Sequence, residues 1–418
     1  MSTPQLSAAA VEAAAQVLAP IVLRTPLEFS PRLSDATGAQ VYLKRENRQI
    51  ARSYKVRGAY HFISGLTDAE RGRGVVCASA GNHGQGVAWS SARLGLRGRV
   101  YVPGNTPRQK RQRILALGEG AVELVVAGSS YDEAGAAARA DADASGAIFV
   151  HPFDDPRTIA GQGSVAVELA EQSPAPLHTV LVPIGGGGLI AGMALWLKER
   201  HPEVRIVGVE PAGAASMTAA LAAGEPTRLS KIDTFVDGAA VGLVGSVTFP
   251  VVRDLVDEVV TVPEGAVCTE MLELYQVEGI IAEPAGALAS TAARQIADSL
   301  PAGSTVACVV SGGNNDVSRY NEIVERSLLH EGLRHYFLVT FPQEPGALRH
   351  FLDDVLSDGE DIVVFEYVKK NNRETGPALV GIELDTAAGL APLLARMAAS
   401  PLQIDQVPPG SPLFGFLI

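Results

Sequence analysis

Short apolar runs rich in β-branched residues alternate with longer, alanine-rich stretches along most of the chain. From about residue 41 to residue 310, the runs GVVCA, RVYV, VELVV, HTVLVPI, VRIVGVE and STVACVV are separated by segments with helical spacing, such as GVAWSSARL, RQKRQRILAL and YDEAGAAARADADA. Strands that alternate with helices in this way are typical of a parallel sheet. The pattern therefore predicts an α/β fold with parallel sheets over this region.

The pattern changes after VERSLLHEGLRH. The runs HYFLVTF, IVVFEYV, ALVGIEL and a short stretch near LQIDQV have the character of strands, and LRHFLDDVL and LAPLLARMAA have that of helices. The resulting order, β-α-β-β-α-β, is that of a ferredoxin-like α+β domain. We expect a first region over residues 1–327, with a smaller subdomain at roughly 53–157 inserted in it, and a separate domain over 334–418.

Length and charge narrow the class of partner. The chain has 418 residues, of which 47% are hydrophobic, which suffices for two or three domains with substantial cores. Its formal net charge is -12, and no run of clustered Lys and Arg is present. Because binding to nucleic acids draws its affinity from such clusters, we expect small molecules rather than nucleic acids as partners.

The chain shows no sign of a disulfide framework, a zinc site or a membrane segment. Three cysteines are widely spaced and form no CxxC pattern; they are Cys77, Cys268 and Cys308. The opening MSTPQLSAAAVEAAAQVL has no basic start and carries Glu12, as an amphipathic helix would. The uncharged run from Thr179 to Leu197 holds Pro183 and a glycine cluster, which does not suit lipid. We expect a cytoplasmic protein without membrane association.

A run of four glycines follows one of the predicted strands and precedes a predicted helix. Residues without a Cβ let backbone N–H groups approach an anion at the positive end of a helix. The alternative is a tight turn that needs positive φ, and four consecutive glycines favour a phosphate site over it. The spacing is neither GxGxxG nor GxxxxGK[ST], which argues against dinucleotides and nucleoside triphosphates. The residues concerned are Gly185, Gly186, Gly187, Gly188 and Leu189.

Two further strand-to-helix turns carry polar side chains. In SAGNHGQG, at 79–86, Ser79, Asn82 and His83 could hold a carboxylate, although ordinary helix capping explains them equally well. In SGGNND, at 311–316, Ser311 offers a neutral donor or acceptor, and taken alone this turn is better explained by capping. Since ligands gather at the carboxyl ends of strands in open α/β sheets, we expect chemistry at these turns.

A lysine stands where a helix is predicted to begin, in SYKVRGAY at 53–60. Lys55 lies between Tyr54 and Val56, and a lysine with apolar neighbours can be partly neutral and hence nucleophilic toward a carbonyl. The alternative is a solvated lysine whose stem merely packs. The lysine and the three turns together match one ligand, pyridoxal 5'-phosphate. That ligand has an aldehyde for the amine, a phosphate for the glycine run and a ring nitrogen for a polar side chain.

These motifs together resemble those of the threonine dehydratases, fold-type II pyridoxal-phosphate enzymes, in particular the short biosynthetic form with one regulatory domain. The likeness covers nearly the whole chain and is carried by LKRENRQIARSYKVRGAY, ASAGNHGQGVA, PIGGGGLIAG, VGVEP, EPAGAL and SGGNND, in that order. The resemblance implies a fold-type II catalytic region with parallel sheets, followed by an ACT-like regulatory domain.

The resemblance also implies roles for individual residues. Lys55 would bind the cofactor aldehyde and later remove the substrate Cα proton, and Tyr54 stands where the family usually has Phe. The cofactor ring would meet Asn82 at its hydroxyl and Ser311 at its nitrogen, and Gly185 to Leu189 would hold the phosphate. The loop for the substrate carboxylate would comprise Ser79, Gly81, Asn82 and His83.

A metal site is not expected. Relatives that bind a divalent cation use an acidic pair downstream of the VEP glutamate. Here Glu210 is followed by PAGAAS, with Ser216 where an Asp could serve.

The activity implied is the dehydration and deamination of L-threonine to 2-oxobutanoate and ammonia, the first step of isoleucine biosynthesis, with L-serine as a secondary substrate. Isoleucine is the expected inhibitor and valine a possible activator. The PGAL turn at 345–348 and FEYVKK at 365–370 are the expected surfaces for effector binding and subunit contact, in a homodimer or homotetramer.

Other functions stay open at this point. L-serine dehydratase and serine racemase share the fold. A non-catalytic amino-acid sensor would not need both Lys55 and a complete glycine loop, and a nucleotide-binding oxidoreductase would need the GxGxxG pattern that this chain lacks.

Overall fold

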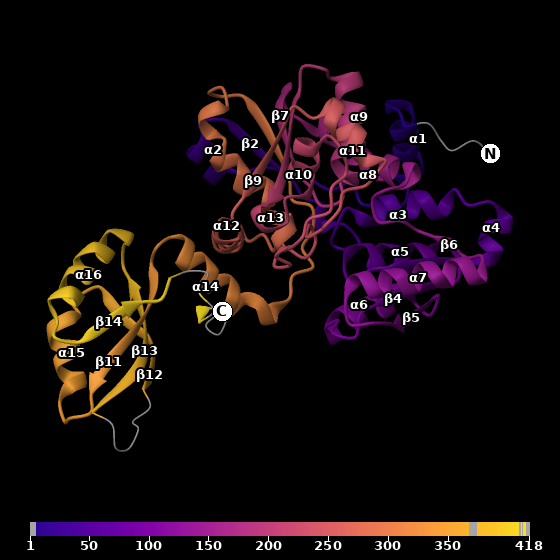
Figure 1. Ribbon diagram of the computed structural model, residues 1–418. Coiled ribbons are helices and arrows are strands. Elements are labelled where there is room, and N and C mark those ends of the chain that lie inside the picture. Colours follow the sequence, from indigo (N-terminus) through magenta and orange to yellow (C-terminus); the bar gives the residue numbers. More distant parts are fainter. Residues whose placement is uncertain (1–5, 368–373, 409–410, 412, 415–418) are drawn as a thin grey trace. The chain divides into compact units, whose positions relative to one another are not determined.

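The computed structural model describes residues 6–367, 374–408, 411, 413 and 414. The chain forms two compact units, Met1–Asp316 and Val317–Ile418 (Figure 1). This division precedes the boundary expected near residue 327, because helix α14 (Tyr320–His330) belongs to the second unit.

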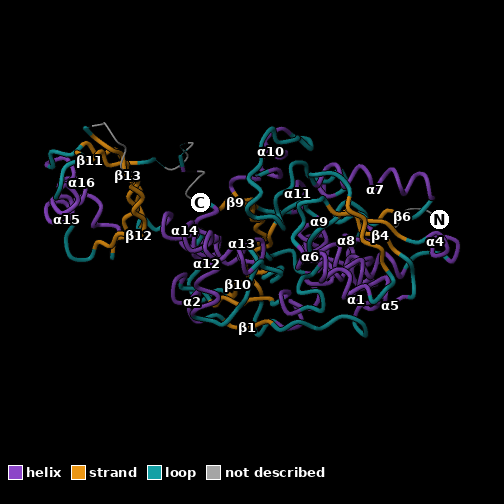
Figure 2. The backbone as a smooth tube through the Cα atoms, turned by 90° about the horizontal axis from the view of Figure 1, so that it is seen from below, coloured by secondary structure: helices purple, strands orange, loops and turns teal. Residues whose placement is uncertain are grey.

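A six-stranded sheet forms the centre of the first unit, with the strand order β1-β2-β10-β7-β8-β9. Only β1 is antiparallel to its neighbour, and the other pairs are parallel. Figure 2 shows α12 and α13 on one side of this sheet and α9 and α11 on the other. The strands are β1 (Leu27–Phe29), β2 (Gln40–Lys44), β7 (Leu177–Pro183), β8 (Arg205–Pro211), β9 (Glu258–Val262) and β10 (Thr305–Val309).

A second, four-stranded parallel sheet has the order β5-β4-β3-β6. Its strands are β3 (Val75–Ala78), β4 (Gly98–Val102), β5 (Val122–Val126) and β6 (Ile148–Phe149). The helices that occur between residues 55 and 145 are α3 (Lys55–Ser64), α4 (Asp68–Arg73), α5 (Asn82–Leu94), α6 (Arg108–Gly118) and α7 (Tyr131–Ser145). The predicted α/β fold with parallel sheets is confirmed.

The remaining helices of the first unit cover the large sheet and join it to the small one. They are α1 (Ala8–Leu18), α2 (Pro31–Thr37), α8 (Pro156–Gln172), α9 (Gly188–Arg200), α10 (Ser216–Ala223), α11 (Thr248–Leu255), α12 (Glu264–Gln276) and α13 (Pro284–Gln295). The apolar run from Thr179 to Leu197 is β7, the glycine turn and α9, most of it buried in one core cluster. None of the helices in the described ranges is long and apolar enough to cross a membrane.

The second unit has the predicted β-α-β-β-α-β order. It consists of β11 (Arg334–Pro342), α15 (Ala347–Val355), β12 (Glu360–Tyr367), β13 (Thr375–Leu384), α16 (Leu390–Ala399) and β14 (Gln403–Gln406), preceded by α14. The sheet is antiparallel, with the order β12-β13-β11-β14 expected of a ferredoxin-like domain. The last residues of the FEYVKK segment, 368–370, lie outside the described residues.

Helix α14 is attached to the second sheet by polar contacts. Glu325 accepts a hydrogen bond from Arg334 at 2.5 Å and another from the Tyr336 hydroxyl at 2.7 Å. These contacts join α14 to β11 within the second unit.

Candidate active site

A small pocket at the carboxyl ends of the strands brings the predicted lysine and turns together. Its lining comes from the starts of α3, α5 and α13, the ends of β7 and β10, and the loop after α10. The lining residues are Tyr54, Lys55, Asn82, Pro183, Ile184, Gly185, Gly238, Ala239, Glu283, Ala285 and Ser311. The prediction that the turns carry the site is supported by this convergence, as the topology of an open α/β sheet requires.

Lys55 is the first residue of α3 and is half-buried at the pocket. Its Nζ donates a hydrogen bond to the backbone oxygen of Pro152 at 2.9 Å and lies 5.2 Å from the centre of the Tyr54 ring. The preceding backbone is held in place, since the N–H of Tyr54 donates to the carbonyl of Ser311 at 3.2 Å. Burial lowers the pKa of Lys55 to about 8, so a sizeable fraction of the amine is neutral near neutral pH.

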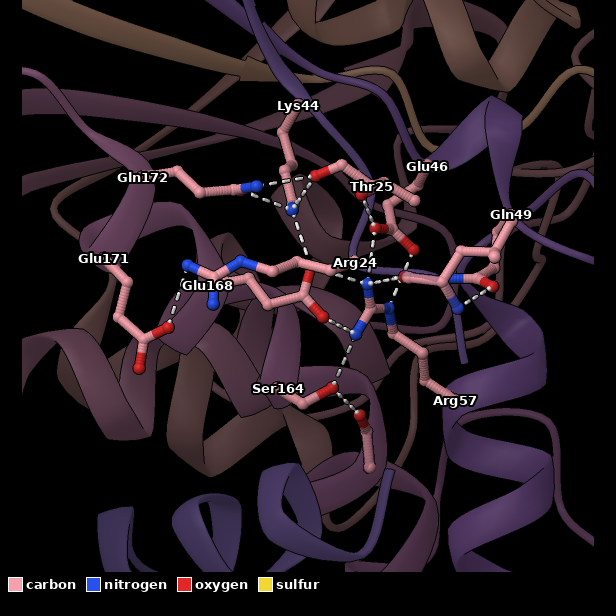
Figure 3. Close-up of polar contacts among 12 residues, drawn as sticks. Arg24, Thr25, Lys44, Glu46, Gln49, Arg57, Ser164, Glu168, Glu171 and Gln172 are labelled. Atoms are coloured by element: carbon pink, nitrogen blue, oxygen red, sulfur yellow. Dashed lines mark hydrogen bonds and ion pairs between the residues drawn. The ribbon is translucent and has the colours of Figure 1, made fainter. Parts of the chain in front are cut away.

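A buried network of charges fixes α3 two residues beyond the lysine (Figure 3). Arg57 and Glu46 are both fully buried, and they share two hydrogen bonds of 2.8 Å. Arg57 also donates to Glu168 of α8 at 2.7 Å, and Lys44 of β2 donates to the other oxygen of Glu168 at 2.7 Å. Two cations therefore face two carboxylates, and the network joins α3 to β2 and α8 without a net buried charge.

The glycine run forms a tight turn from β7 into α9. Gly187 has a φ of 93°, which only glycine adopts without strain, and α9 begins at Gly188. A Cβ on Gly186 would run into the Phe153 ring, and one on Gly188 would lie 2.5 Å from the Gln162 side-chain oxygen. The turn thus presents bare backbone at the positive end of a helix, which suits an anion.

Leu189 differs from the four glycines. Its side chain is buried in the core cluster behind the large sheet. Only its backbone N–H, in the first turn of α9, is placed for contact with an anion.

Asn82 and Ser311 line the pocket from two different turns. Asn82, the first residue of α5, donates from Nδ2 to Glu283 at 2.5 Å. Ser311 follows β10, is 4% exposed, and its hydroxyl lies 3.2 Å from the Ala285 carbonyl. Because a hydroxyl group rotates, the Ser311 oxygen could donate to or accept from a ring nitrogen of a bound molecule.

Three of the predicted substrate-loop residues do not line this pocket. The Ser79 hydroxyl accepts from the N–H of Gly81 at 3.2 Å, within the turn itself. His83 is buried, and its Nε2 donates to the Val150 carbonyl at 2.8 Å. Burial lowers the pKa of His83 to about 3, so this imidazole is neutral and packs behind the turn. Of the four residues predicted for this loop, the pocket receives only the side chain of Asn82.

Glu210 is engaged in capping α10. Its carboxylate accepts from the N–H of Met217 at 2.6 Å and from the N–H and hydroxyl of Thr218 at 2.8 and 2.7 Å. Within the described part of the chain, no group of three or more His, Cys, Asp or Glu side chains is placed to hold a metal ion.

Several pocket residues have no counterpart among the predicted ones. Glu283 precedes α13, and Gly238 and Ala239 lie in a loop after α10. Outside the pocket lining, Phe153 covers Gly186 from the loop after β6. The sequence does contain a signal for Glu283. EPAGAL places an acidic residue directly before a proline that begins a helix, and none of the predicted roles accounts for that residue. The Phe153 contact has no local sequence signal.

The residues of the pocket fit pyridoxal phosphate. The pocket combines an amine of lowered pKa, the first glycine of a turn that only bare backbone can occupy, and the neutral hydroxyl of Ser311. The fold and the pocket thus define an enzyme for a phosphorylated carbonyl cofactor.

Comparison with known proteins agrees with this conclusion. Residues 18–312 match the family profile of pyridoxal-phosphate dependent enzymes, and residues 325–417 match that of the C-terminal regulatory domain of threonine dehydratase. The L-threonine dehydratase biosynthetic IlvA of Mycobacterium bovis is 58% identical over 415 residues, which cover 99% of this chain and 96% of that protein.

Solved structures are similar as well. The processed form of threonine deaminase isoform 2 from Solanum lycopersicum is 36% identical, with a TM-score of 0.73, over 79% of this chain and 91% of that one. Maize serine racemase is 33% identical, with a TM-score of 0.71, over 78% of this chain and 98% of that one. The chain belongs to the threonine dehydratase family of pyridoxal-phosphate-dependent enzymes, and the resemblance noted in its sequence is confirmed.

Proposed function

We propose that this enzyme converts L-threonine to 2-oxobutanoate and ammonia, and L-serine, more slowly, to pyruvate and ammonia. The observation that carries the proposal is the convergence of Lys55, Asn82, Gly185 and Ser311 on one pocket. The printed name of the mycobacterial relative, a biosynthetic L-threonine dehydratase, supports this choice of substrate.

Lys55 is assigned two tasks. Its Nζ would hold the cofactor and, when free of it, would take the proton from the substrate Cα. The lowered pKa of Lys55 suits both tasks, because each needs the neutral amine. Bound pyridoxal phosphate supplies the carbonyl that binds the amine and a conjugated ring that delocalises charge from Cα.

The surrounding residues hold the cofactor and the substrate. We assign the phosphate to the backbone of Gly185 to Leu189, where α9 begins. We assign the ring hydroxyl to Asn82 and the ring nitrogen to Ser311, with Tyr54 beside the lysine. A neutral partner at the nitrogen limits electron withdrawal by the ring, so loss of the β-hydroxyl is favoured over side reactions.

The substrate carboxylate is assigned to the turn before α5. Since His83 is neutral and packs behind that turn, its side chain positions the loop rather than binding charge. We assign the carboxylate to the Ser79 hydroxyl, which can donate while it accepts from the N–H of Gly81, and to the backbone of Gly81 and Asn82 at the start of α5.

The second unit is assigned to feedback control. Its match to the C-terminal regulatory domain of threonine dehydratase supports effector binding. We propose isoleucine as the inhibitor and valine as the opposing activator, in a cytoplasmic homodimer or homotetramer. Such control suits the first step of isoleucine biosynthesis.

A substrate panel tests the proposal. Purified protein with added pyridoxal phosphate should acquire a visible absorbance band and release ammonia and 2-oxo acid fastest from L-threonine. Serine racemase, whose fold is the same, would instead form D-serine from L-serine. Faster turnover of L-serine than L-threonine, or racemisation without release of ammonia, would refute the assignment.

A further inference from the structure

Glu283 is a buried carboxyl that lines the same pocket as Lys55. It is 4% exposed and directly precedes α13. It and Lys55 are the two pocket-lining residues that can carry charge near neutral pH. A Cβ on Gly312 would run into Oε1 of Glu283, so a glycine at this position makes room for the carboxyl.

Both carboxyl oxygens of Glu283 accept hydrogen bonds. Oε1 accepts from Nδ2 of Asn82 at 2.5 Å, and Oε2 accepts from the backbone N–H of Asn314 at 3.2 Å. A glutamine in this place would offer one acceptor oxygen and would turn an NH₂ group toward a donor. The arrangement therefore requires a carboxyl rather than an amide.

These contacts determine which way the Asn82 amide points. Oδ1 of Asn82 accepts from Nδ2 of Asn314 at 2.6 Å, and that Nδ2 also donates to the Ala51 carbonyl at 2.8 Å. The Asn314 amide is thus oriented by a backbone acceptor, and the Asn82 amide must turn its nitrogen to Glu283. An amide nitrogen carries two N–H groups, so the second is left for an acceptor on a molecule in the pocket.

Charged groups from several elements act on Glu283. Asp237, in the loop after α10, raises the pKa of Glu283, whereas Lys110 of α6 lowers it. Tyr54 and Lys55, at the start of α3, interact electrostatically with the same carboxyl. Burial is the largest effect and raises the pKa of Glu283 to about 7. The carboxyl is therefore able to change its charge when a charged molecule enters the pocket.

We propose that Glu283 is a positioning residue for the cofactor: it turns the Asn82 amide so that one N–H is donated to the ring hydroxyl oxygen of pyridoxal phosphate. This inference rests on the proposed function, which assigns Asn82 to that hydroxyl. A donated hydrogen bond favours the ionised hydroxyl, so the loss of Glu283 changes the absorbance of the bound cofactor as well as its affinity.

Cofactor binding to the protein stripped of pyridoxal phosphate tests the inference without any assay of turnover. Absorbance titrations with pyridoxal phosphate compare the wild type, Glu283→Gln, Asn82→Ala and the double variant. Each single variant is expected to bind about tenfold more weakly and to move the band in the same direction. The double variant should bind no more weakly than Asn82→Ala, because both changes remove one interaction. Glu225→Gln, which removes an exposed carboxylate outside the pocket, should bind like the wild type.

Two results would overturn the inference: wild-type affinity and spectrum in Glu283→Gln, or a loss of about a hundredfold in the double variant, which would mean independent roles. If Glu283→Gln fails to fold, Glu283→Asp replaces it, because the shorter side chain withdraws the carboxyl from Nδ2 of Asn82. Unchanged affinity and spectrum in that folded variant would equally refute the inference. Failure of the proposed function would give results different from failure of this inference. The wild type would then take up no pyridoxal phosphate, or Lys55→Ala would keep the wild-type spectrum.

Discussion

Lys55 donates a hydrogen bond of 2.9 Å from Nζ to the backbone oxygen of Pro152, a residue 97 positions further along the chain. The same oxygen accepts from Nε2 of Gln162 at 3.1 Å, and the next residue, Phe153, covers Gly186. One short segment after β6 therefore contacts both the lysine and the glycine turn.

Lys55→Ala is expected to abolish turnover and leave the fold intact. The variant loses the amine to which we assign cofactor binding and proton removal, whereas Pro152 keeps its hydrogen bond from Gln162. Circular dichroism should match the wild type, while borohydride reduction should attach no pyridoxal phosphate. Lys231→Ala, at an exposed lysine, is the matched control and should keep full activity. More than a trace of dehydratase activity in Lys55→Ala without added amine would contradict the assignment.

Arg57→Met is expected to destabilise the first unit by about 3–5 kcal/mol, because it leaves the fully buried Glu46 without its cation. Denaturant unfolding of the protein measures the change. The control is Arg24→Met, since the Arg24 side chain is 57% exposed and its pair with Glu171 should contribute about 1 kcal/mol or less. Equal decreases in the free energy of unfolding of the two variants would show that the buried network stabilises the protein no more than an exposed ion pair does.

Gly186→Ala is expected to lower the stability of the cofactor-free protein by about 1–3 kcal/mol, because the new methyl group meets the Phe153 ring. Phe153→Ala removes that obstacle, so the double variant Gly186→Ala with Phe153→Ala should be more stable than the sum of the single effects implies. Thermal unfolding of the wild type, the two single variants and the double variant gives the four stabilities of this double-mutant cycle. Strict additivity would mean that the two residues do not touch.

Acid is expected to destabilise the cofactor-free protein through two histidines near the pocket. Burial lowers the pKa of His83 to about 3 and that of His151 to about 4, so the unfolded chain binds protons below pH 6.5 that the folded chain does not. Stability is therefore present above pH 6.5 and is lost as the pH falls toward 4, at up to about 1.4 kcal/mol per pH unit for each histidine.

The structure also shows what protonation of His151 would break. Its Nδ1 accepts from the N–H of Asp154 at 2.8 Å, and a protonated ring cannot accept there.

Melting temperatures of wild type and His83→Gln across pH 4 to 7 measure the contribution of His83 to this loss of stability. Glutamine is a suitable replacement because it can still donate to the Val150 carbonyl. His83→Gln should show the shallower loss, and His350→Gln, at an exposed histidine, should follow the wild type. A wild-type slope in His83→Gln would contradict the prediction.

A chain ending at Asp316 is expected to stay active and to ignore isoleucine. The structure places the cut before α14, because Glu325 in that helix is bonded to Arg334 and Tyr336 of the second unit. In the full chain, saturating isoleucine should change the apparent affinity for threonine by about 5- to 150-fold, corresponding to a coupling of roughly 1–3 kcal/mol. Substrate saturation curves of both proteins with and without isoleucine provide the test, and equal inhibition of the shortened chain would refute regulation by the second unit.

The sequence by itself determined the class of fold and indicated the groups that we propose carry the chemistry. Strands such as Val122–Val126 and Leu177–Pro183, and the helices after them, follow from local periodicity and turn residues, and their bounds agree closely with the predicted runs. Lys55 at a helix start and the glycine run before α9 were recognisable because their unusual features are contained within a few neighbouring residues. The two-residue strand β6 was missed, since two residues carry no periodicity.

Only the tertiary structure decided how these groups meet. Glu283 and Asn82 are 201 positions apart, and their hydrogen bond depends on the packing of α13 beside the start of α5. The orientation of His83, away from the pocket and onto Val150, and the cover that Phe153 forms over Gly186 likewise depend on contacts between distant segments. The physical reason is that backbone preferences act over a few residues, whereas the direction of a buried polar side chain is set by whichever partner the folded chain brings within reach.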